Sequence, residues 1–344
     1  MRVLITGGAG YIGSHTAKAL ARAGIEPVVY DNLSEGHHWA VKWGPLVEAD
    51  LSDRHSLKQA IQRHDITAAI HFAAHAYVGE SVHEPRRYFQ NNVTNTLTLL
   101  DALLDAGVDH IVFSSSCAIY GVPDAIPISE DHSKQPVNPY GESKLFIERV
   151  LGWYGQAYDL RWAALRYFNA AGADPAGELG EAHHPETHLL PLVIEAALDK
   201  RTAVKIFGVD YPTPDGTAIR DYVHVSDLAE AHVLALQHLL SGGESFAVNL
   251  GSGRGVSVRE IVAAVERIAG VSINVRPVAR RTGDPPVLVA DPARAEKLLS
   301  WHPEFSALES IVSTAWHWRS LAPRSDSATT EVRPPPAGLS TSAR

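Results

Sequence analysis

Tyr140 and Lys144 stand four residues apart in the segment Asn138-Pro139-Tyr140-Gly141-Glu142-Ser143-Lys144. On a helix, two residues at this spacing lie on one face, one turn from each other. A lysine ammonium favours the phenolate form of a neighbouring tyrosine, so a group with an ordinary pKa of about 10 becomes a base closer to neutrality. Ser114-Ser115-Ser116 ends a predicted strand upstream, and its last hydroxyl is the expected partner of this pair. The three residues Tyr140, Lys144 and Ser116 predict a site for hydride and proton transfer.

A glycine-rich turn near the N-terminus predicts the nucleotide that such chemistry uses. Gly7, Gly10 and Gly13 form a G-x-x-G-x-x-G turn between a predicted strand at 3–6 and a predicted helix at 14–23. Glycines let the backbone turn tightly and approach a pyrophosphate, whose charge the helix N-terminus favours.

Acidic residues after the next two apolar stretches indicate which dinucleotide is bound. Asp31 ends the second predicted strand, where a carboxylate accepts hydrogen bonds from the adenosine ribose hydroxyls. A carboxylate there repels a 2′-phosphate, and no arginine follows directly, so NAD is favoured over NADP. Asp50-Leu51 ends the next apolar stretch and either holds the adenine or caps a loop.

Alternating strands and helices predict the fold. Short apolar runs at 3–6, 27–31, 68–72 and 111–114 are separated by helical stretches. This order is typical of an α/β protein with a Rossmann-type doubly wound parallel sheet. We expect an NAD-binding Rossmann domain at 1–170 and a smaller C-terminal α/β substrate lobe at 171–322, with some segments returning to the first domain. The lobe opens with a loop at about 171–188 and a helix at about 189–201, and the polar stretch 323–344 is expected to be a disordered tail.

Composition narrows the classes of partner. The chain has 344 residues, of which 45% are hydrophobic and 20% charged, and its net charge is −9. Without a basic run, this charge argues against a nucleic acid or a membrane surface as partner. The single cysteine, Cys117, excludes an internal disulfide and favours a reducing compartment. Met1 leads directly into the first strand and no apolar run reaches membrane-spanning length, so we expect a cytoplasmic protein.

These motifs, taken in order, resemble the extended short-chain dehydrogenase/reductase superfamily, and within it the UDP-glucose 4-epimerases, over about residues 1–320. Beyond the glycine turn, the resemblance rests on Phe72-Ala73-Ala74, Val78-Gly79-Glu80-Ser81-Val82, Asn91-Asn92-Val93, Ser114-Ser115-Ser116, Arg166-Tyr167-Phe168-Asn169, Asp210-Tyr211-Pro212-Thr213, Asp215-Gly216-Thr217, Arg220-Asp221-Tyr222-Val223-His224-Val225 and Arg280-Arg281-Thr282-Gly283-Asp284.

The resemblance implies a reaction in which C4 of a UDP-sugar gives a hydride to NAD⁺ and takes it back on its other face. Tyr140 would be the base, Lys144 would lower its pKa, and Ser116 would bind the reacting oxygen. The residues implied to contact NAD are Gly7, Gly10, Tyr11, Ile12, Gly13, Asp31, Asn32, Asp50, Leu51, Phe72, Ala73, Ala74, Asn91, Ser114, Tyr140, Lys144, Tyr167 and Phe168. Those implied to contact the UDP-sugar are Ser116, Tyr140, Asn169, His188, Leu189, Arg220, Arg281 and Asp284.

Three positions depart from the family pattern. His75-Ala76-Tyr77 stands where many members have a lysine for the cofactor phosphate, and Thr187-His188 where an asparagine pair often meets the uridine. Leu288 replaces a bulky tyrosine of some members, which would enlarge the sugar pocket and admit N-acetylated substrates. An epimerase of UDP-GlcNAc/UDP-GalNAc therefore remains an alternative. An epimerase of UDP-xylose/UDP-arabinose is another, because the stretch Ala76-Tyr77-Val78-Gly79-Glu80-Ser81 is shared with such enzymes. An alternative of another class is a catalytically inert dinucleotide-sensing regulator.

Other charged residues have structural interpretations. His183, His184 and His188 are close in sequence, but no cysteine or firm carboxylate pattern accompanies them, so no metal is expected. Glu148 is expected at a solvated helix position, and an ion pair of Arg220 with Asp221 is an alternative to substrate binding.

A 4,6-dehydratase is disfavoured because the Asp-Glu pair that it uses is absent after Ser116. The resemblance also implies a homodimer formed through helices near 84–106 and 140–157.

Overall fold

The computed structural model describes residues 1–199, 202–281 and 283–321. The stretch 323–344, expected to be a disordered tail, lies outside the described residues. Within the described residues, none of the helices combines the length and the apolar character that crossing a membrane requires.

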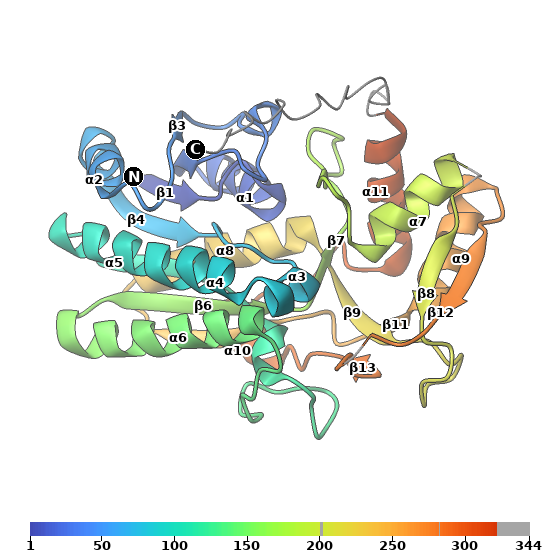
Figure 1. Cartoon of the computed structure of the whole chain (residues 1–344). Helices are drawn as coiled ribbons and strands as arrows, with labels where there is room; N and C mark the ends of the chain where they lie inside the picture. The colour runs from blue at the N-terminus through green and yellow to red at the C-terminus, as the bar shows by residue number, and fades with distance from the viewer. Residues whose placement is uncertain (200–201, 282, 322–344) are drawn as a thin grey trace, which may run out of the picture.

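The central element is a parallel sheet of seven strands in the order β10-β6-β5-β4-β1-β2-β3 (Figure 1). Its strands are β1 (Arg2–Thr6), β2 (Glu26–Asp31), β3 (Leu46–Glu48), β4 (Ile66–His71), β5 (His110–Ser116), β6 (Arg161–Tyr167) and β10 (Phe246–Leu250). β2 pairs with one edge of β1 and β4 with the other, so the strand order reverses between β1 and β4. In a sheet of this kind, ligands bind at the carboxyl ends of the strands next to the reversal.

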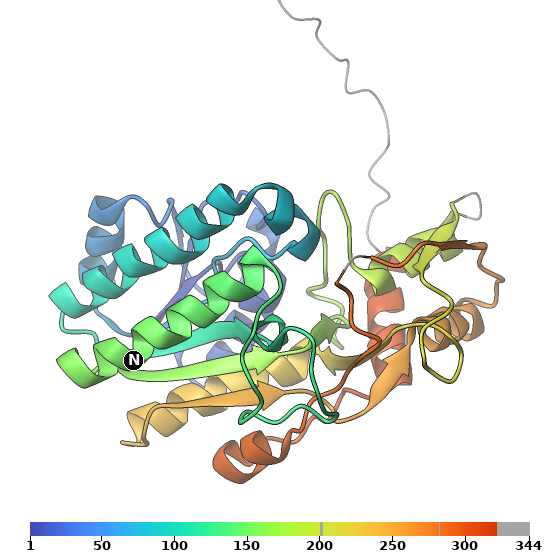
Figure 2. The ribbon, with the colours of Figure 1, turned by 60° about the horizontal axis from the view of Figure 1, so that its bottom comes forward.

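Helices cover both faces of the sheet, as Figure 2 shows. On one face, α1 (Tyr11–Arg22) and α8 (Val225–Leu240) pack against the sheet in a core that includes Leu20, Leu165 and Leu236. On the other face, α2 (Arg54–Arg63), α5 (Asn95–Asp105) and α6 (Pro139–Tyr158) bury Leu57, Leu100 and Leu151 against the strands. Apolar burial on both faces is what the nearly continuous apolar strands require, and it confirms the predicted doubly wound α/β class.

The helix expected near 84–106 is helical throughout but changes its geometry along its length. It consists of α4 (Pro85–Tyr88), the π-helical segment η2 (Phe89–Thr94) and α5, and it follows the short α3 (Val78–His83). Within the wider π turn, Asn92 is buried and its side chain holds the loop at His75, accepting from His75 N at 2.8 Å and donating to His75 O at 3.0 Å. The π segment therefore positions the loop after β4.

A smaller lobe stands beyond the carboxyl ends of the large sheet. It contains β7 (Asn169–Ala171), β8 (Val204–Phe207), β9 (Ile219–His224), β11 (Gly255–Ser257), β12 (Val275–Val278), β13 (Val287–Leu288), α7 (Leu189–Leu198), α9 (Val258–Ala269) and α11 (Leu308–Leu321). Its three helices share a core that includes Val193, Val265 and Val312. α8, β10 and α10 (Ala293–Leu299) return to the first domain, where β10 extends the large sheet beside β6. The short 3-10 turns η1 (His38–Ala40) and η3 (Cys117–Tyr120) follow β2 and β5.

Candidate active site

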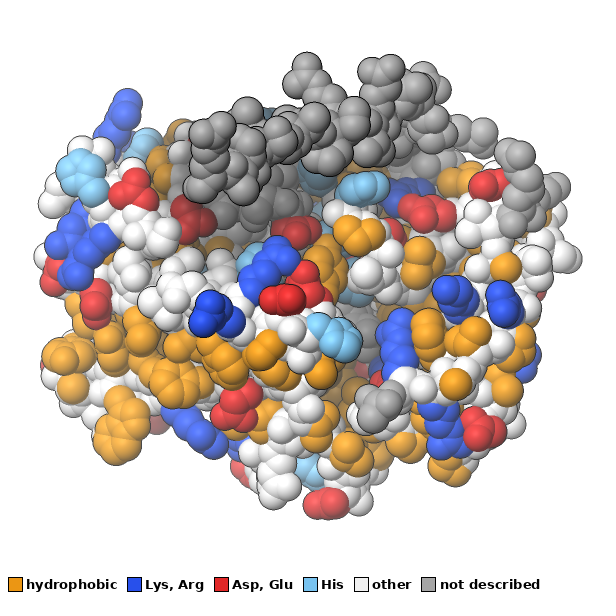
Figure 3. Space-filling view, in the orientation of Figure 1, with side chains coloured by type: hydrophobic (Ala, Val, Ile, Leu, Met, Phe, Trp, Pro, Cys, Tyr) orange, Lys and Arg blue, Asp and Glu red, His pale blue; other side chains and the backbone are white. Residues whose placement is uncertain are grey.

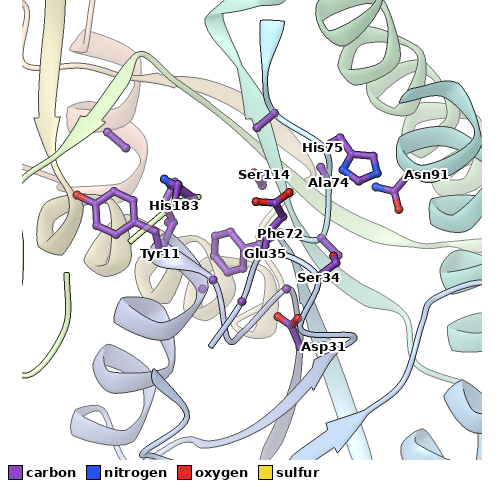
Figure 4. A pocket seen from close by; sticks show the side chains of 18 of the residues that line it. Tyr11, Asp31, Ser34, Glu35, Phe72, Ala74, His75, Asn91, Ser114 and His183 are labelled. Atoms are coloured by element: carbon purple, nitrogen blue, oxygen red, sulfur yellow. The ribbon is translucent and has the colours of Figure 1, made fainter. Parts of the chain in front are cut away.

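A cavity opens where the carboxyl ends of β1, β2, β4, β5 and β6 meet the lobe (Figure 4). It is lined by almost the whole predicted cofactor set: Gly7, Gly10, Tyr11, Ile12, Gly13, Asp31, Asn32, Asp50, Leu51, Phe72, Ala73, Ala74, Asn91, Ser114, Lys144, Tyr167 and Phe168. Tyr140 is the member of that set that does not line it. From the predicted substrate set, Asn169 and His188 line the cavity. Residues from many segments far apart in sequence thus meet in one place.

The glycine turn is packed too tightly against its own backbone to hold side chains at Gly7 and Gly13. A Cβ at Gly13 would stand 2.2 Å from Gly7 O, and one at Gly7, whose φ is +72°, would stand 2.6 Å from Ala73 N. α1 begins directly after this turn, and its N-cap residue, Gly10, offers no side-chain acceptor. The first backbone N–H groups of the helix therefore keep their capacity to bind an anion. The turn fits the pyrophosphate of a dinucleotide.

The two acidic residues predicted to contact the nucleotide have different surroundings. Asp31 is buried, and its carboxylate accepts hydrogen bonds from Ala9 N at 2.9 Å and Leu33 N at 2.8 Å, bracing the glycine turn. Asp50 accepts from Asn32 Nδ2 at 2.6 Å and from Ser52 N at 2.9 Å. Asp50 is thus a loop cap that also lines the cavity, and its contact with the adenine stays a prediction.

The predicted catalytic residues come from the start of α6 and the end of β5. Asn138 caps α6 by accepting a hydrogen bond from Gly141 N at 2.8 Å, so Tyr140 falls in the first turn and Lys144 in the second. The Lys144 ammonium donates to Ser114 O at 2.7 Å and lies 5.9 Å from the centre of the Tyr140 ring. Ser116 is buried at the end of β5 and caps the following turn by accepting from Ala118 N at 3.2 Å. Lys144 thus joins α6 to the end of β5, and Ser116 is held by the turn that follows it.

Burial favours the protonated form of Tyr140, which is the opposite of the expected phenolate. It raises the pKa of Tyr140 to about 12, although a hydrogen bond with Ser116 acts in the opposite direction. It also lowers the pKa of Lys144 to about 7, since the ammonium has lost its water and faces the Phe113 ring at 4.9 Å. The protein alone therefore keeps Tyr140 protonated at neutral pH, and the expected lowering of its pKa requires further positive charge in the cavity.

Glu148 corrects the expectation of a solvated helix position. Its buried carboxylate accepts from Arg166 Nε at 2.9 Å and Nη2 at 2.6 Å, and from Ser115 Oγ at 2.5 Å. Arg166 also donates to Tyr120 Oη, which donates to Asn249 Oδ1. This buried network ties α6 to β5, β6 and β10, and so holds the helix and the strand end that carry the predicted catalytic residues.

The remaining predicted substrate residues lie in the lobe. Arg220 pairs with Asp284 at 2.5 Å, and not with its neighbour Asp221. Asp221 is buried and accepts from the backbone N–H groups of Ser252, Gly253 and Ala290, so the alternative ion pair is wrong. The guanidinium of Arg281 lies 4.1 Å from the centre of the Phe207 ring, and Leu189 is the first residue of α7. None of these four, Leu189, Arg220, Arg281 and Asp284, is part of the cavity lining.

Several lining residues were not predicted. They are Tyr30, Ser34, Glu35, Gly36, Ala49, His75, Ala76, Ala170, Glu181 and His183. Glu35 accepts a hydrogen bond from Tyr77 Oη at 3.1 Å, which links the loop after β2 to α3. Figure 4 shows Glu35 and Ser34 on the same wall as Asp31. Both residues follow a strand that ends in the acidic Asp31, and this position is the sequence signal that could have predicted them. Leu288 packs on a cluster that contains Phe168 and Ile119.

The fold and the site define a dinucleotide-dependent enzyme of the Rossmann class, for which Tyr140, Lys144 and Ser116 are the predicted catalytic residues. The profile of the NAD dependent epimerase/dehydratase family matches residues 3–251, and the chain belongs to this family. It is 52% identical to a UDP-glucose 4-epimerase of Rhizobium meliloti over 92% of this chain and 97% of that relative.

Solved structures agree with this assignment. UDP-glucose 4-epimerase from Brucella ovis in complex with NAD is 54% identical, with a TM-score of 0.90 over 92% of this chain and 98% of that one. The UDP-glucose 4-epimerase from Bifidobacterium longum in complex with NAD⁺ and UDP is 36% identical, with a TM-score of 0.88 over 93% and 98% of the two chains.

Proposed function

We propose that this enzyme is an NAD-dependent 4-epimerase that interconverts UDP-galactose and UDP-glucose. The observation that carries the proposal is the convergence of Lys144 and Ser114 with the glycine turn in one cavity, next to Tyr140 and Ser116. When bound at the glycine turn and Asp31, NAD⁺ would supply the hydride acceptor and donor for inversion at C4 of the sugar. A dinucleotide-sensing regulator has no use for this catalytic group, and the epimerase relatives do not favour it.

The chain's residues supply binding and proton transfer. Tyr140 Oη accepts the proton of the sugar 4-hydroxyl, directly or through the hydroxyl of Ser116, and later gives it back. The Lys144 ammonium stabilises the phenolate form of Tyr140. The 4-keto sugar turns about its pyrophosphate between the two half-reactions, so the site must hold the UDP firmly and the hexose loosely. Arg220 and Arg281 are the cations proposed to hold the UDP phosphates.

The residues around the cavity fit NAD. The glycine turn and the N-terminus of α1 provide a place for the pyrophosphate. Asp31 keeps oxygen lone pairs for the ribose hydroxyls, since each of its oxygens accepts one backbone hydrogen bond. Asp31, Glu35 and Asp50 line the same cavity, and their carboxylates would repel a 2′-phosphate. The acidic wall therefore supports NAD over NADP.

We also propose that the enzyme is a homodimer formed through α5 and α6. Figure 3 shows hydrophobic side chains gathered over these two helices. On α6, Phe146 is 43%, Trp153 69% and Tyr158 58% exposed, and Phe146 and Trp153 stand seven residues apart on one helix face. Large apolar side chains at helical spacing are what a bundle of helices from two subunits would bury. A cytoplasmic location is likewise proposed, and the lone Cys117 supports it.

An activity assay tests the proposed reaction. Purified protein is incubated with UDP-galactose without added NAD, and formation of UDP-glucose is followed. Parallel reactions contain UDP-N-acetylgalactosamine and UDP-xylose. We expect turnover without added cofactor, fastest for UDP-galactose. Inactivity of the folded protein on all three substrates, with and without added NAD, would exclude the proposed function.

A further inference from the structure

The loop between β7 and α7 brings together four side chains of the types that bind metal ions. Glu181, His183 and Glu186 lie on this loop, and His188 is the N-cap residue of α7. One nitrogen or oxygen atom of each lies within 4.8 Å of the corresponding atoms of the other three. The sequence did not predict this group because its two carboxylates alternate with the histidines on an irregular loop and follow no recognised ligand motif.

The distances within the cluster are close to those around a bound ion. A tetrahedral ion with bonds of about 2.0–2.2 Å keeps its ligand atoms about 3.3–3.6 Å apart. His183 Nδ1 lies 3.2 Å from Glu181 Oε1 and 3.9 Å from Glu186 Oε2, and His188 Nδ1 lies 3.6 Å from Glu186 Oε1. The contact of His188 Nδ1 with Glu181 Oε1, at 2.5 Å, is a hydrogen bond that an entering ion would replace.

Two atoms of the cluster have no hydrogen-bond partner although they are buried. They are Glu186 Oε2 and His183 Nδ1, which is 3.2 Å from Glu181 Oε1 but outside hydrogen-bond geometry, and the two atoms face each other across 3.9 Å. The Glu186 side chain is only 5% exposed. A buried polar atom without a partner costs about 1–3 kcal/mol, so such atoms in a folded protein call for an explanation. An ion bound between them would satisfy both.

The charge of the cluster also favours a bound cation. Both carboxylates are buried, Glu181 to 7% exposure and Glu186 to 5%. In the part of the chain that the structure describes, the nitrogen atoms that form ion pairs with them belong to His183 and His188, and none to a lysine or arginine. Neutral histidines would leave two negative charges uncompensated, and one of them, on Glu181, is in the lining of a cavity proposed to bind two diphosphates. A divalent cation would neutralise them.

We propose that Glu181, His183, Glu186 and His188 bind one divalent transition-metal ion, for which Zn²⁺ is the best match. Two imidazole nitrogens and two carboxylate oxygens suit Zn²⁺, whereas Mg²⁺ and Ca²⁺ prefer oxygen ligands alone. Four protein ligands complete a tetrahedron and leave no open position, so the ion has a structural role.

Such an ion would hold the loop against the first domain. The His183 ring packs edge-on against the rings of Tyr11 at 6.4 Å and Tyr77 at 6.2 Å, and Figure 4 shows Tyr11 and His183 side by side. Tyr11 Oη also donates to Gly172 O at 2.6 Å, near the start of the loop. The ion would thus fix the loop as one wall of the cofactor cavity. His188 Nε2 would stay available for the predicted uridine contact.

Direct metal binding tests this proposal independently of activity. Wild-type enzyme is treated with a chelator, dialysed and titrated with Co²⁺, whose visible absorption reports tetrahedral binding, and Zn²⁺ is then added as competitor. We expect one equivalent of Co²⁺ per chain, displaced by Zn²⁺, and a thermal unfolding temperature that rises with Zn²⁺ concentration. His183→Ala and Glu186→Gln should each weaken binding at least tenfold. His184→Ala, which removes the exposed histidine next to the cluster, should bind like the wild type.

Either of two results would overturn the proposal. One is the absence of a stoichiometric Co²⁺ spectrum with the wild type, which would mean that the histidines form ordinary ion pairs with the carboxylates. The other is equal weakening by His184→Ala and His183→Ala, which would assign the metal to surface histidines. Because the wild-type titration decides the first point, poor folding of a variant cannot leave the proposal untested, and neither result depends on the epimerase reaction.

Discussion

The ammonium nitrogen of Lys144 lies 2.7 Å from the backbone carbonyl oxygen of Ser114. This contact joins the helix that carries the proposed base, Tyr140, to the strand end that carries the proposed proton relay, Ser116. The site therefore depends on how α6 is held against β5 as much as on the catalytic side chains themselves.

Tyr140→Phe should lower kcat by about 10²–10⁴-fold, because general acid–base catalysis by a positioned side chain contributes about that much. The substitution removes only the hydroxyl, so the thermal unfolding temperature and the bound NAD content should stay close to those of the wild type. Steady-state kinetics with UDP-galactose measures the effect. Wild-type kcat in the variant would remove Tyr140 from the mechanism.

The lowered pKa of Lys144 predicts how stability depends on pH. Folding brings this pKa to about 7 from an ordinary value of about 10.4. Between these two pH values the unfolded chain binds more protons at this group than the folded protein does. The contribution of Lys144 to the free energy of unfolding therefore increases as the pH rises. The slope is at most about 1.4 kcal/mol per pH unit.

Urea denaturation of nucleotide-free protein at about pH 7 and about pH 9 measures this slope. Lys144→Met should remove the rise that the wild type shows over this window. An identical pH dependence in the two proteins would mean that Lys144 keeps its ordinary pKa.

Breaking the Glu148–Arg166 pair should destabilise the fold strongly. Arg166→Met leaves a buried carboxylate without its bidentate partner, which costs about 3–5 kcal/mol in the free energy of unfolding. The matched control is Glu309→Gln, which breaks an exposed ion pair: the side chain of Arg267 is 59% exposed and that of Glu309 70%. This substitution should cost less than about 1 kcal/mol in the free energy of unfolding. Similar losses in chemical denaturation of the two variants would contradict the structural role given to the network.

Arg220→Ala should raise the KM for UDP-galactose by about tenfold or more, because a charge-assisted hydrogen bond to a phosphate is worth about 1.5–3 kcal/mol. Asp284→Asn breaks the same ion pair but keeps the cation, so it separates phosphate binding from the Arg220–Asp284 contact. If Asp284→Asn raises the KM as much as Arg220→Ala does, Arg220 acts on the structure of the lobe and not on the substrate.

Trp153→Asp should convert the proposed dimer into monomers, because it places a charge in the centre of the apolar face of α6. Light scattering coupled to size-exclusion chromatography gives the mass directly. Val209→Asp, at a 39% exposed apolar residue in the lobe, is the control and should leave the mass unchanged. A monomeric wild type would exclude the dimer.

The sequence predicted what depends on local geometry. The glycine turn, the Tyr140/Lys144 spacing and Asp31 follow from strand–turn–helix rules, and the structure brings all of them to one edge of the sheet. The features that the sequence did not predict depend on long-range packing. Glu148 is buried because Arg166 reaches it from β6, and the partner of Arg220 lies 64 residues further along the chain. The protonation of Lys144 was also beyond the sequence, since burial sets its pKa.

The fate of the hydrogen at C4 tests the central claim most directly. UDP-galactose labelled with deuterium at C4 is converted in ordinary water, and the UDP-glucose formed is examined by mass spectrometry and NMR. Hydride removal and return within one cavity predicts that the deuterium stays on C4 of the inverted product. Loss of the label to solvent would contradict hydride transfer and would indicate inversion by proton exchange at carbon.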